Sequence, residues 1–141
     1  MTEPESFQAF IDAHGYLSWL DLRVETVEEG YLEMRIPYDE KLLNPVGNPK
    51  TIHGGIAATL VDTASGFVLR TVFDDPANAR LATTDLNVSY LRPASDDLLA
   101  EATVVRAGNS MGVVEVTVRT TDADGEPTEA VVGRSSYRLF R

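Results

Sequence analysis

Residues 53–72 read HGGIAATLVDTASGFVLRTV, a long and nearly uncharged segment. The single charged side chain between Gly54 and Leu69 is Asp62. At about 100° per residue, one helical arc is apolar and holds Ile56, Ala57, Leu60, Val61, Ala64, Phe67 and Val68. The opposite arc is small and mostly uncharged, and it holds Gly55, Ala58, Thr59, Asp62, Ser65 and Gly66. The pattern predicts a long helix over residues 54–72 that packs on a sheet through its apolar arc.

The small arc of this helix makes Asp62 a candidate functional residue. A helix with so little charge is not expected to face solvent, so a loop or another subunit should cover the small arc. A carboxylate in such a place is stable when it is hydrogen-bonded or has a raised pKa, and carboxylates with a raised pKa cluster at active sites. The same pattern also fits a surface aspartate on a solvated helix face, and the pattern alone leaves both interpretations open.

The rest of the chain predicts one short helix and six strands. Ser6–Ala13 has the pattern of an amphipathic helix, with Ser6 as N-cap and His14-Gly15 at its end. The β-like runs are Leu17–Val27, Tyr31–Pro37, Ala79–Leu91, Leu98–Ala107, Met111–Thr121 and Thr128–Phe140, and residues 39–50 are predicted as a loop. This order predicts a single α+β domain over residues 1–141, with one long helix on a largely antiparallel sheet of about six strands.

Composition excludes several classes of function. The 141 residues include no cysteine and two histidines, so disulfides, thiolate nucleophiles and a histidine-based metal cluster are not expected. The net charge of −10 argues against nucleic-acid binding. No uncharged run reaches the roughly 18 residues of a membrane helix, and the acidic N-terminus is unlike a secretory signal. A cytoplasmic protein without a membrane partner, a metal or another cofactor is expected.

The acidic charge has two interpretations. Arginine outnumbers lysine ten to two, and acidic residues occur in pairs such as Glu28-Glu29 and Asp74-Asp75. High salt shortens the Debye length to about 3 Å at 1 M and screens self-repulsion, so this surface fits a high-salt habitat. It fits an acidic mesophilic protein equally well.

His53-Gly54-Gly55 lies immediately before the long helix. Paired glycines let the backbone approach a ligand closely, and the free amides of a helix N-terminus favour developing negative charge. These are the requirements of an oxyanion hole. Two adjacent glycines also occur in an ordinary loop-to-helix transition, so this motif is not decisive by itself.

Together these segments resemble the hot-dog-fold thioesterases of the phenylacetate-degradation (PaaI-like) group. The matching residues are Thr51-Ile52-His53-Gly54-Gly55, Leu60-Val61-Asp62 and Asp85-Leu86-Asn87-Val88-Ser89-Tyr90-Leu91-Arg92-Pro93. The resemblance implies an acyl-CoA thioesterase that releases a free acid and coenzyme A from an acyl or aryl-acyl substrate. It also implies a homodimer, often paired into a homotetramer, with active sites at the subunit interface.

The resemblance assigns catalytic roles to five residues. The amide of Gly54 would polarise the thioester carbonyl, and Asp62 from the opposite subunit would act as nucleophile or as general base. Asn44 would assist the carbonyl, and Thr83 would orient water. His53 is expected to fix the loop by hydrogen bonding.

Three further residues are expected to contact the substrate. An apparent insertion of Asn48-Pro49-Lys50 departs from the family pattern, so Asn48 is an alternative to Asn44. Gly55 would let the backbone approach the substrate. Arg92 would meet coenzyme A phosphates, although it also fits a simple strand end.

Two other functions stay open, a hot-dog enoyl-CoA hydratase or dehydratase and a non-catalytic acyl-CoA binding module. The sequence Gly108-Asn109-Ser110-Met111-Gly112 matches a nucleophile elbow, but it lies between two predicted strands and both histidines precede it. The sequence Asp122-Ala123-Asp124-Gly125 lacks the first and last ligands of a calcium loop. Both are interpreted as turns.

Overall fold

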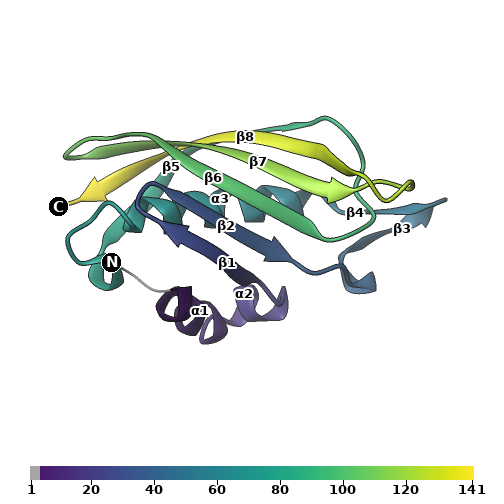
Figure 1. Cartoon of the computed structure of the whole chain (residues 1–141), viewed down its shortest axis with the longest axis horizontal. Helices are drawn as coiled ribbons and strands as arrows, with labels where there is room; N and C mark the ends of the chain where they lie inside the picture. Colours follow the sequence, from purple (N-terminus) through teal and green to yellow (C-terminus); the bar gives the residue numbers. More distant parts are fainter. Residues whose placement is uncertain (1–3) are drawn as a thin grey trace.

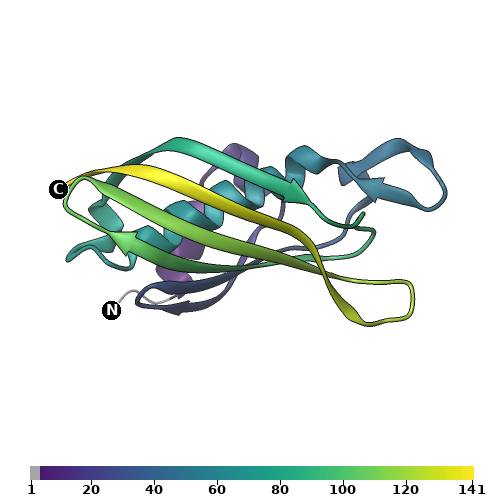
Figure 2. The ribbon, with the colours of Figure 1, turned by 90° about the horizontal axis from the view of Figure 1, so that it is seen from above.

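One long helix lies on a six-stranded antiparallel sheet in the computed structural model of the chain, which describes residues 4–141 (Figures 1 and 2). The helix is α3, Gly54–Arg70, and it contacts β2, β5, β6, β7 and β8. The strands are β1 (Arg23–Glu28), β2 (Tyr31–Ile36), β5 (Arg80–Tyr90), β6 (Leu98–Ala107), β7 (Met111–Thr121) and β8 (Pro127–Phe140). Their order across the sheet is β1-β2-β6-β7-β8-β5, and every neighbouring pair is antiparallel. The predicted α+β architecture is confirmed.

The apolar arc of α3 faces the sheet as predicted. Except for the partly buried Ile56, every residue of that arc is buried. Two glycines in the sheet let the helix approach, because a Cβ at Gly112 would lie 2.6 Å from Leu69 and one at Gly133 would lie 2.7 Å from Val61. Ser65 belongs to the small arc of the helix in the sequence pattern, and in the structure its side chain is fully buried. Its hydroxyl donates to the Val61 carbonyl, so the side chain is buried with its donor satisfied.

The N-terminal segment contains two helices rather than one. Helix α1 spans Pro4–Asp12, so Ser6 lies inside it and the prediction of Ser6 as N-cap was wrong. Helix α2 spans Gly15–Trp19 and replaces the first part of the strand predicted over residues 17–27. The reason is local, because the His14 side chain accepts a hydrogen bond from the Leu17 amide and so caps α2.

The segment predicted as a loop over residues 39–50 is mostly ordered structure. After the 3₁₀ turn η1 (Glu40–Leu42), strands β3 (Leu43–Gly47) and β4 (Lys50–Ile52) form an antiparallel hairpin. Figure 1 shows this hairpin projecting from the end of the molecule opposite the C-terminus. Gly47, Asn48 and Pro49 lie at the hairpin tip, where turn residues are required, whereas Asn44 and Pro45 lie within β3. A second 3₁₀ turn, η2 (Pro76–Asn78), connects α3 to β5.

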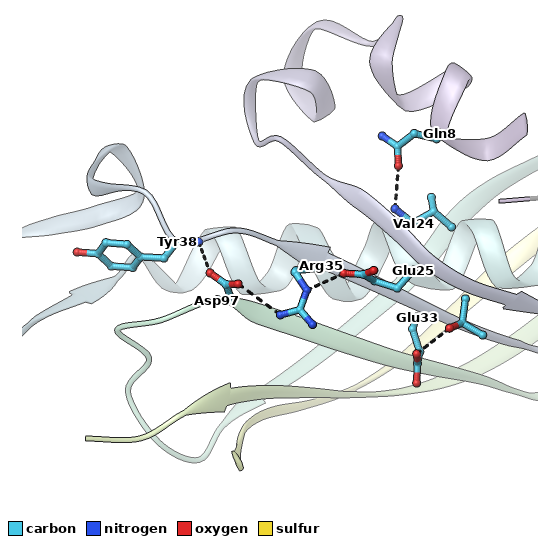
Figure 3. A network of polar contacts seen from close by, with 8 residues as sticks. Gln8, Val24, Glu25, Glu33, Arg35, Tyr38 and Asp97 are labelled. Carbon is cyan, nitrogen blue, oxygen red and sulfur yellow. Dashed lines mark hydrogen bonds and ion pairs between the residues drawn. The ribbon is translucent and has the colours of Figure 1, made fainter. Parts of the chain in front are cut away.

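Polar contacts connect the strands at the β1 edge of the sheet (Figure 3). The Arg35 guanidinium bridges Glu25 on β1, at 2.6 Å, and Asp97 beside β6, at 3.4 Å. The Gln8 side chain ties α1 to the start of β1, since its amide oxygen accepts from the Val24 amide at 2.8 Å. The Gln8 contact therefore holds α1 against β1.

Candidate active site

Asp62 lies on α3 where β5 and β8 pass the helix. Thr83 on β5 and Tyr137 on β8 are directly opposite each other in the strand pairing, so their side chains lie on the same face of the sheet. The Thr83 hydroxyl donates to Asp62 Oδ1 at 2.8 Å, and the Tyr137 hydroxyl donates to the same oxygen at 2.5 Å. Two hydroxyls from adjacent strands therefore converge on one carboxylate oxygen.

Strand β5 is irregular immediately after Thr83. The register with β8 shifts between Thr83 and Asp85, as it does at a β-bulge. Asp85 consequently pairs with Ser136, which lies on the opposite face of the sheet from Tyr137. A second carboxylate is thereby kept away from Asp62.

Asp62 opens into a hollow of about 370 Å³, here called the Asp62 hollow. Its apolar walls come from Phe10, Leu17, Phe67 and Leu81, and its polar groups come from His14, Asp62, Thr63, Arg70 and Tyr137. Burial lowers the pKa of Arg70, whose guanidinium lies 5.3 Å from the Phe10 ring centre. The hollow combines apolar walls with polar groups, and Asp62 is the one acid among them.

The first turn of α3 is held by side-chain contacts at each of its two glycines. His53 caps the helix, because its Nδ1 accepts from the Gly55 amide at 2.8 Å. The Tyr90 hydroxyl donates to the Gly54 carbonyl at 2.6 Å, and the Tyr90 ring covers Gly54. Among residues 4–141 no acceptor is paired with the Gly54 amide, which is therefore free to bind an oxygen.

Gly54 lines a second hollow of about 310 Å³, the Gly54 hollow. Thr51, Tyr90 and Arg92 also line it. Arg92 donates to the Glu129 carbonyl at 2.9 Å, so its head group is fixed beside this hollow. The motif around Gly54 and the motif Tyr90-Leu91-Arg92-Pro93 therefore line the same hollow.

The two predicted asparagines occupy different parts of the β3–β4 hairpin. Asn44 lies near the base, and its side-chain amide donates to the Thr51 hydroxyl at 3.4 Å. Asn48 lies at the exposed tip, between Gly47 and Lys50. Within one chain, Asn44 is the asparagine next to the Gly54 hollow.

Asp62 and Gly54 do not meet within one chain. They are separated by eight residues of helix, or about 12 Å of helical rise. Each lines its own hollow, and neither hollow contains both residues. One chain therefore holds the carboxylate in one place and the free amide in another.

Sequence reasoning missed Tyr137 as part of the site. Its contact with Asp62 joins residues 75 positions apart, and no local motif marks such a pair. The available signal was the alternation of β8, which places Tyr137 on the buried face with Ser135 and Leu139. A buried tyrosine hydroxyl needs a hydrogen-bond partner.

Within residues 4–141 no cluster of His, Asp or Glu is arranged to hold a metal ion. No helix in the same residues is long and apolar enough to cross a membrane. The described site offers one carboxylate, hydroxyl donors, a helix-terminal amide and the side chains of His14 and Arg70.

Comparison with known proteins identifies the family. Residues 49–125 match the thioesterase superfamily model. A Halobacterium salinarum protein, provisionally named an esterase, is 52% identical over 136 residues, which cover 95% of this chain and 90% of that protein. The medium/long-chain acyl-CoA thioesterase YigI of Salmonella typhimurium is 30% identical over 117 residues, covering 73% of this chain and 74% of YigI.

Solved structures show the same fold. Zebrafish thioesterase superfamily member 2 superposes with a TM-score of 0.78 at 26% identity, covering 97% of this chain and 95% of that one. A thioesterase family protein from Silicibacter pomeroyi gives a TM-score of 0.84 at 23% identity and covers 96% of each chain. The predicted hot-dog fold is confirmed, and the chain belongs to the thioesterase superfamily.

Proposed function

We propose that this protein is an acyl-CoA thioesterase in which Asp62 is the catalytic carboxylate. The observation that carries the proposal is the convergence of the Thr83 and Tyr137 hydroxyls on Asp62 Oδ1 beside a hollow with apolar walls on one side. Asp62 Oδ2 accepts no hydrogen bond from residues 4–141 and is therefore available to act on a thioester. The medium/long-chain acyl-CoA thioesterase activity named for YigI supports the same reaction.

The reaction needs a base or nucleophile and a stabilised oxyanion. Asp62 either attacks the thioester carbonyl carbon or takes a proton from the water that attacks it. In both routes the carbonyl oxygen becomes negative, and the free Gly54 amide at the start of α3 would stabilise it. Coenzyme A leaves as its thiol after taking up a proton. In the general-base route the free acid forms in the same step, whereas in direct attack water must then hydrolyse the acyl–Asp62 anhydride to release the acid and restore Asp62. After single-turnover hydrolysis in ¹⁸O-water, label in Asp62 would establish direct attack, because general-base catalysis places the label in the product acid alone.

We further propose that each site combines Asp62 of one copy with Gly54 of a second copy. The separation of about 12 Å along α3 supports this, since one thioester carbonyl cannot contact both groups of the same helix. The exposed edge strand β5 offers a surface for the second copy. It is eleven residues long and exposes Leu86 (39%) and Tyr90 (54%). The other edge, β1, is six residues long and half charged, which protects it from pairing.

The acyl group would occupy the Asp62 hollow. Its walls of Phe10, Leu17, Phe67 and Leu81 suit an alkyl or aryl group, and its volume lies within the usual range for small-molecule sites. In the two-copy site, Arg92 and Asn44 would lie on the side of the coenzyme A moiety together with Gly54. A PaaI-like tetramer built from two such dimers is the corresponding assembly.

The test is thiol release from a panel of short, medium, long and aryl acyl-CoA esters. Asp62→Asn is expected to reduce turnover by several orders of magnitude while circular dichroism stays unchanged. Turnover by Asp62→Asn at the wild-type rate would remove Asp62 from the mechanism. Binding without turnover by the wild type would indicate an acyl-CoA binding module, and hydration of enoyl esters would indicate a hydratase.

The shared site has its own test, which mixes two inactive variants. Asp62→Asn keeps the Gly54 amide, and Gly54→Pro keeps the Asp62 carboxylate. When the two chains are unfolded together and refolded at equal amounts, half of the dimers are mixed and each mixed dimer has one intact site. Activity should recover to about a quarter of the wild-type value. No recovery from refolded mixed dimers would place the whole site within one chain.

A further inference from the structure

We propose that Tyr137 is a positioning residue of this reaction, which with Thr83 holds one oxygen of the Asp62 carboxylate and turns the other toward the substrate. The inference rests on the proposed function of Asp62. It concerns a residue far from every motif that suggested that function.

The hydrogen-bond geometry supports this role. The Tyr137 hydroxyl lies 2.5 Å from Asp62 Oδ1 and 2.6 Å from the Asp62 carbonyl oxygen, so its single hydrogen is shared between side chain and backbone. Thr83 donates to the same Oδ1 at 2.8 Å. The carboxylate is therefore fixed relative to its own backbone and to strand β5. Among residues 4–141 its second oxygen has no donor.

The helix leaves room for the phenol at one position. Gly66 lies one turn after Asp62, and a Cβ at Gly66 would lie 3.1 Å from the Tyr137 hydroxyl oxygen. Any larger residue at position 66 would push the phenol away from Asp62. A small residue here thus serves the contact between Tyr137 and Asp62.

The phenol acts as a permanent donor. Tyr137 is 6% exposed, and burial together with the hydrogen bond to Asp62 raises its pKa, so it stays protonated at every pH at which the fold is studied. Donors to a carboxylate favour the charged form. The other charged or titratable groups facing Asp62 across the hollow are His14 and Arg70. His14 Nδ1 is already engaged with the Leu17 amide. Tyr137 and Thr83 are therefore the direct hydrogen-bond partners of the Asp62 side chain within residues 4–141.

The test compares pH profiles of Tyr137→Phe and wild type with one acyl-CoA ester. Phenylalanine keeps the ring and removes the donor. Loss of a hydrogen bond to a charged group is expected to move the acid limb of the kcat profile upward by about one pH unit. At the pH optimum kcat should fall by about 10- to 100-fold, with KM within about threefold, because the lost contact acts on the reacting carboxylate. Thr83→Val should move the acid limb in the same direction.

Tyr31→Phe is the matched control. Tyr31 also donates to a carboxylate, Glu33 Oε2 at 2.6 Å, but it lies on β2 away from both hollows. Its removal should leave kcat and the acid limb unchanged. If Tyr137→Phe proves poorly folded, Gly66→Ala provides the same test with the phenol displaced rather than removed, and a smaller upward shift is expected.

The outcomes separate this inference from the proposed function. If Asp62→Asn is inactive and Tyr137→Phe keeps the wild-type kcat and acid limb, Tyr137 is a packing residue and the inference is wrong. If Tyr137→Phe loses activity without any shift of the acid limb, its role is structural and the inference is again wrong. If Asp62→Asn is active, the proposed function itself fails.

Discussion

Replacing Gly54 by proline removes the one atom to which the proposed mechanism assigns the oxyanion, the amide hydrogen. Proline suits the first position of a helix, where the amide has no intrahelical partner. His53, with φ near −56° and ψ near 131°, has a ψ in the range that a residue before proline prefers. A Cβ at position 54 would, however, lie 3.2 Å from the Tyr90 ring. Gly54→Ala is the matched control, because it adds the same Cβ and keeps the amide hydrogen.

The expected magnitude follows from this pair of variants. Loss of one oxyanion donor costs about 2.7–4 kcal/mol of transition-state stabilisation, or about 10²- to 10³-fold in kcat. We therefore expect kcat of Gly54→Pro to be lower than that of Gly54→Ala by about that factor, with similar KM values. Thiol release is a clean assay, since the chain contains no cysteine and a thiol reagent detects coenzyme A alone. Equal kcat values for two folded variants would refute the assignment of the Gly54 amide.

Three further predictions concern the fold and the surface. Gly133→Ala should lower the free energy of unfolding by about 1–3 kcal/mol, because the added Cβ would lie 2.7 Å from Val61. Urea titration measures this change, and an unchanged unfolding midpoint would refute the prediction. The net charge of −10 predicts that the melting temperature rises between about 0.1 and 1 M KCl as self-repulsion is screened, whereas a flat or falling value would show that repulsion is unimportant. The hydrogen bond to Glu33 raises the pKa of Tyr31 to about 12. The stability that this tyrosine contributes should therefore be lost as the pH rises from about 10 to about 12. Tyr31→Phe should make this loss smaller when unfolding is measured as a function of pH.

The sequence predicted the elements whose signal is continuous and local. A run of sixteen residues with Asp62 as its one charge defines α3, and alternation defines the four C-terminal strands. Helix α2 was missed because Leu17 and the apolar residues after it fit a strand as well as a helix, and the deciding contact is the His14 cap. The β3–β4 hairpin was missed because turn residues at its tip dominated its short stems.

The site was predictable where a motif marks it and not where tertiary pairing creates it. Gly54 and Asp62 lie in recognisable sequence contexts, and resemblance to a family also suggested Thr83. Tyr137 reaches Asp62 only because β8 pairs with β5, a contact between distant parts of the chain. Non-local pairing of this kind leaves no periodic signal in the sequence.

The bulge in β5 has a consequence for insertions and deletions. Thr83 and Tyr90 both reach α3, one at Asp62 and the other at Gly54, yet they are seven positions apart. Side chains an odd number of positions apart point to opposite faces of a regular strand. The extra residue at the bulge changes this parity, so both side chains face the helix. Deleting Thr84 would leave Thr83 and Tyr90 six positions apart on a regular strand, so both side chains would still face the helix, whereas one further residue inserted between them would turn one of the two away.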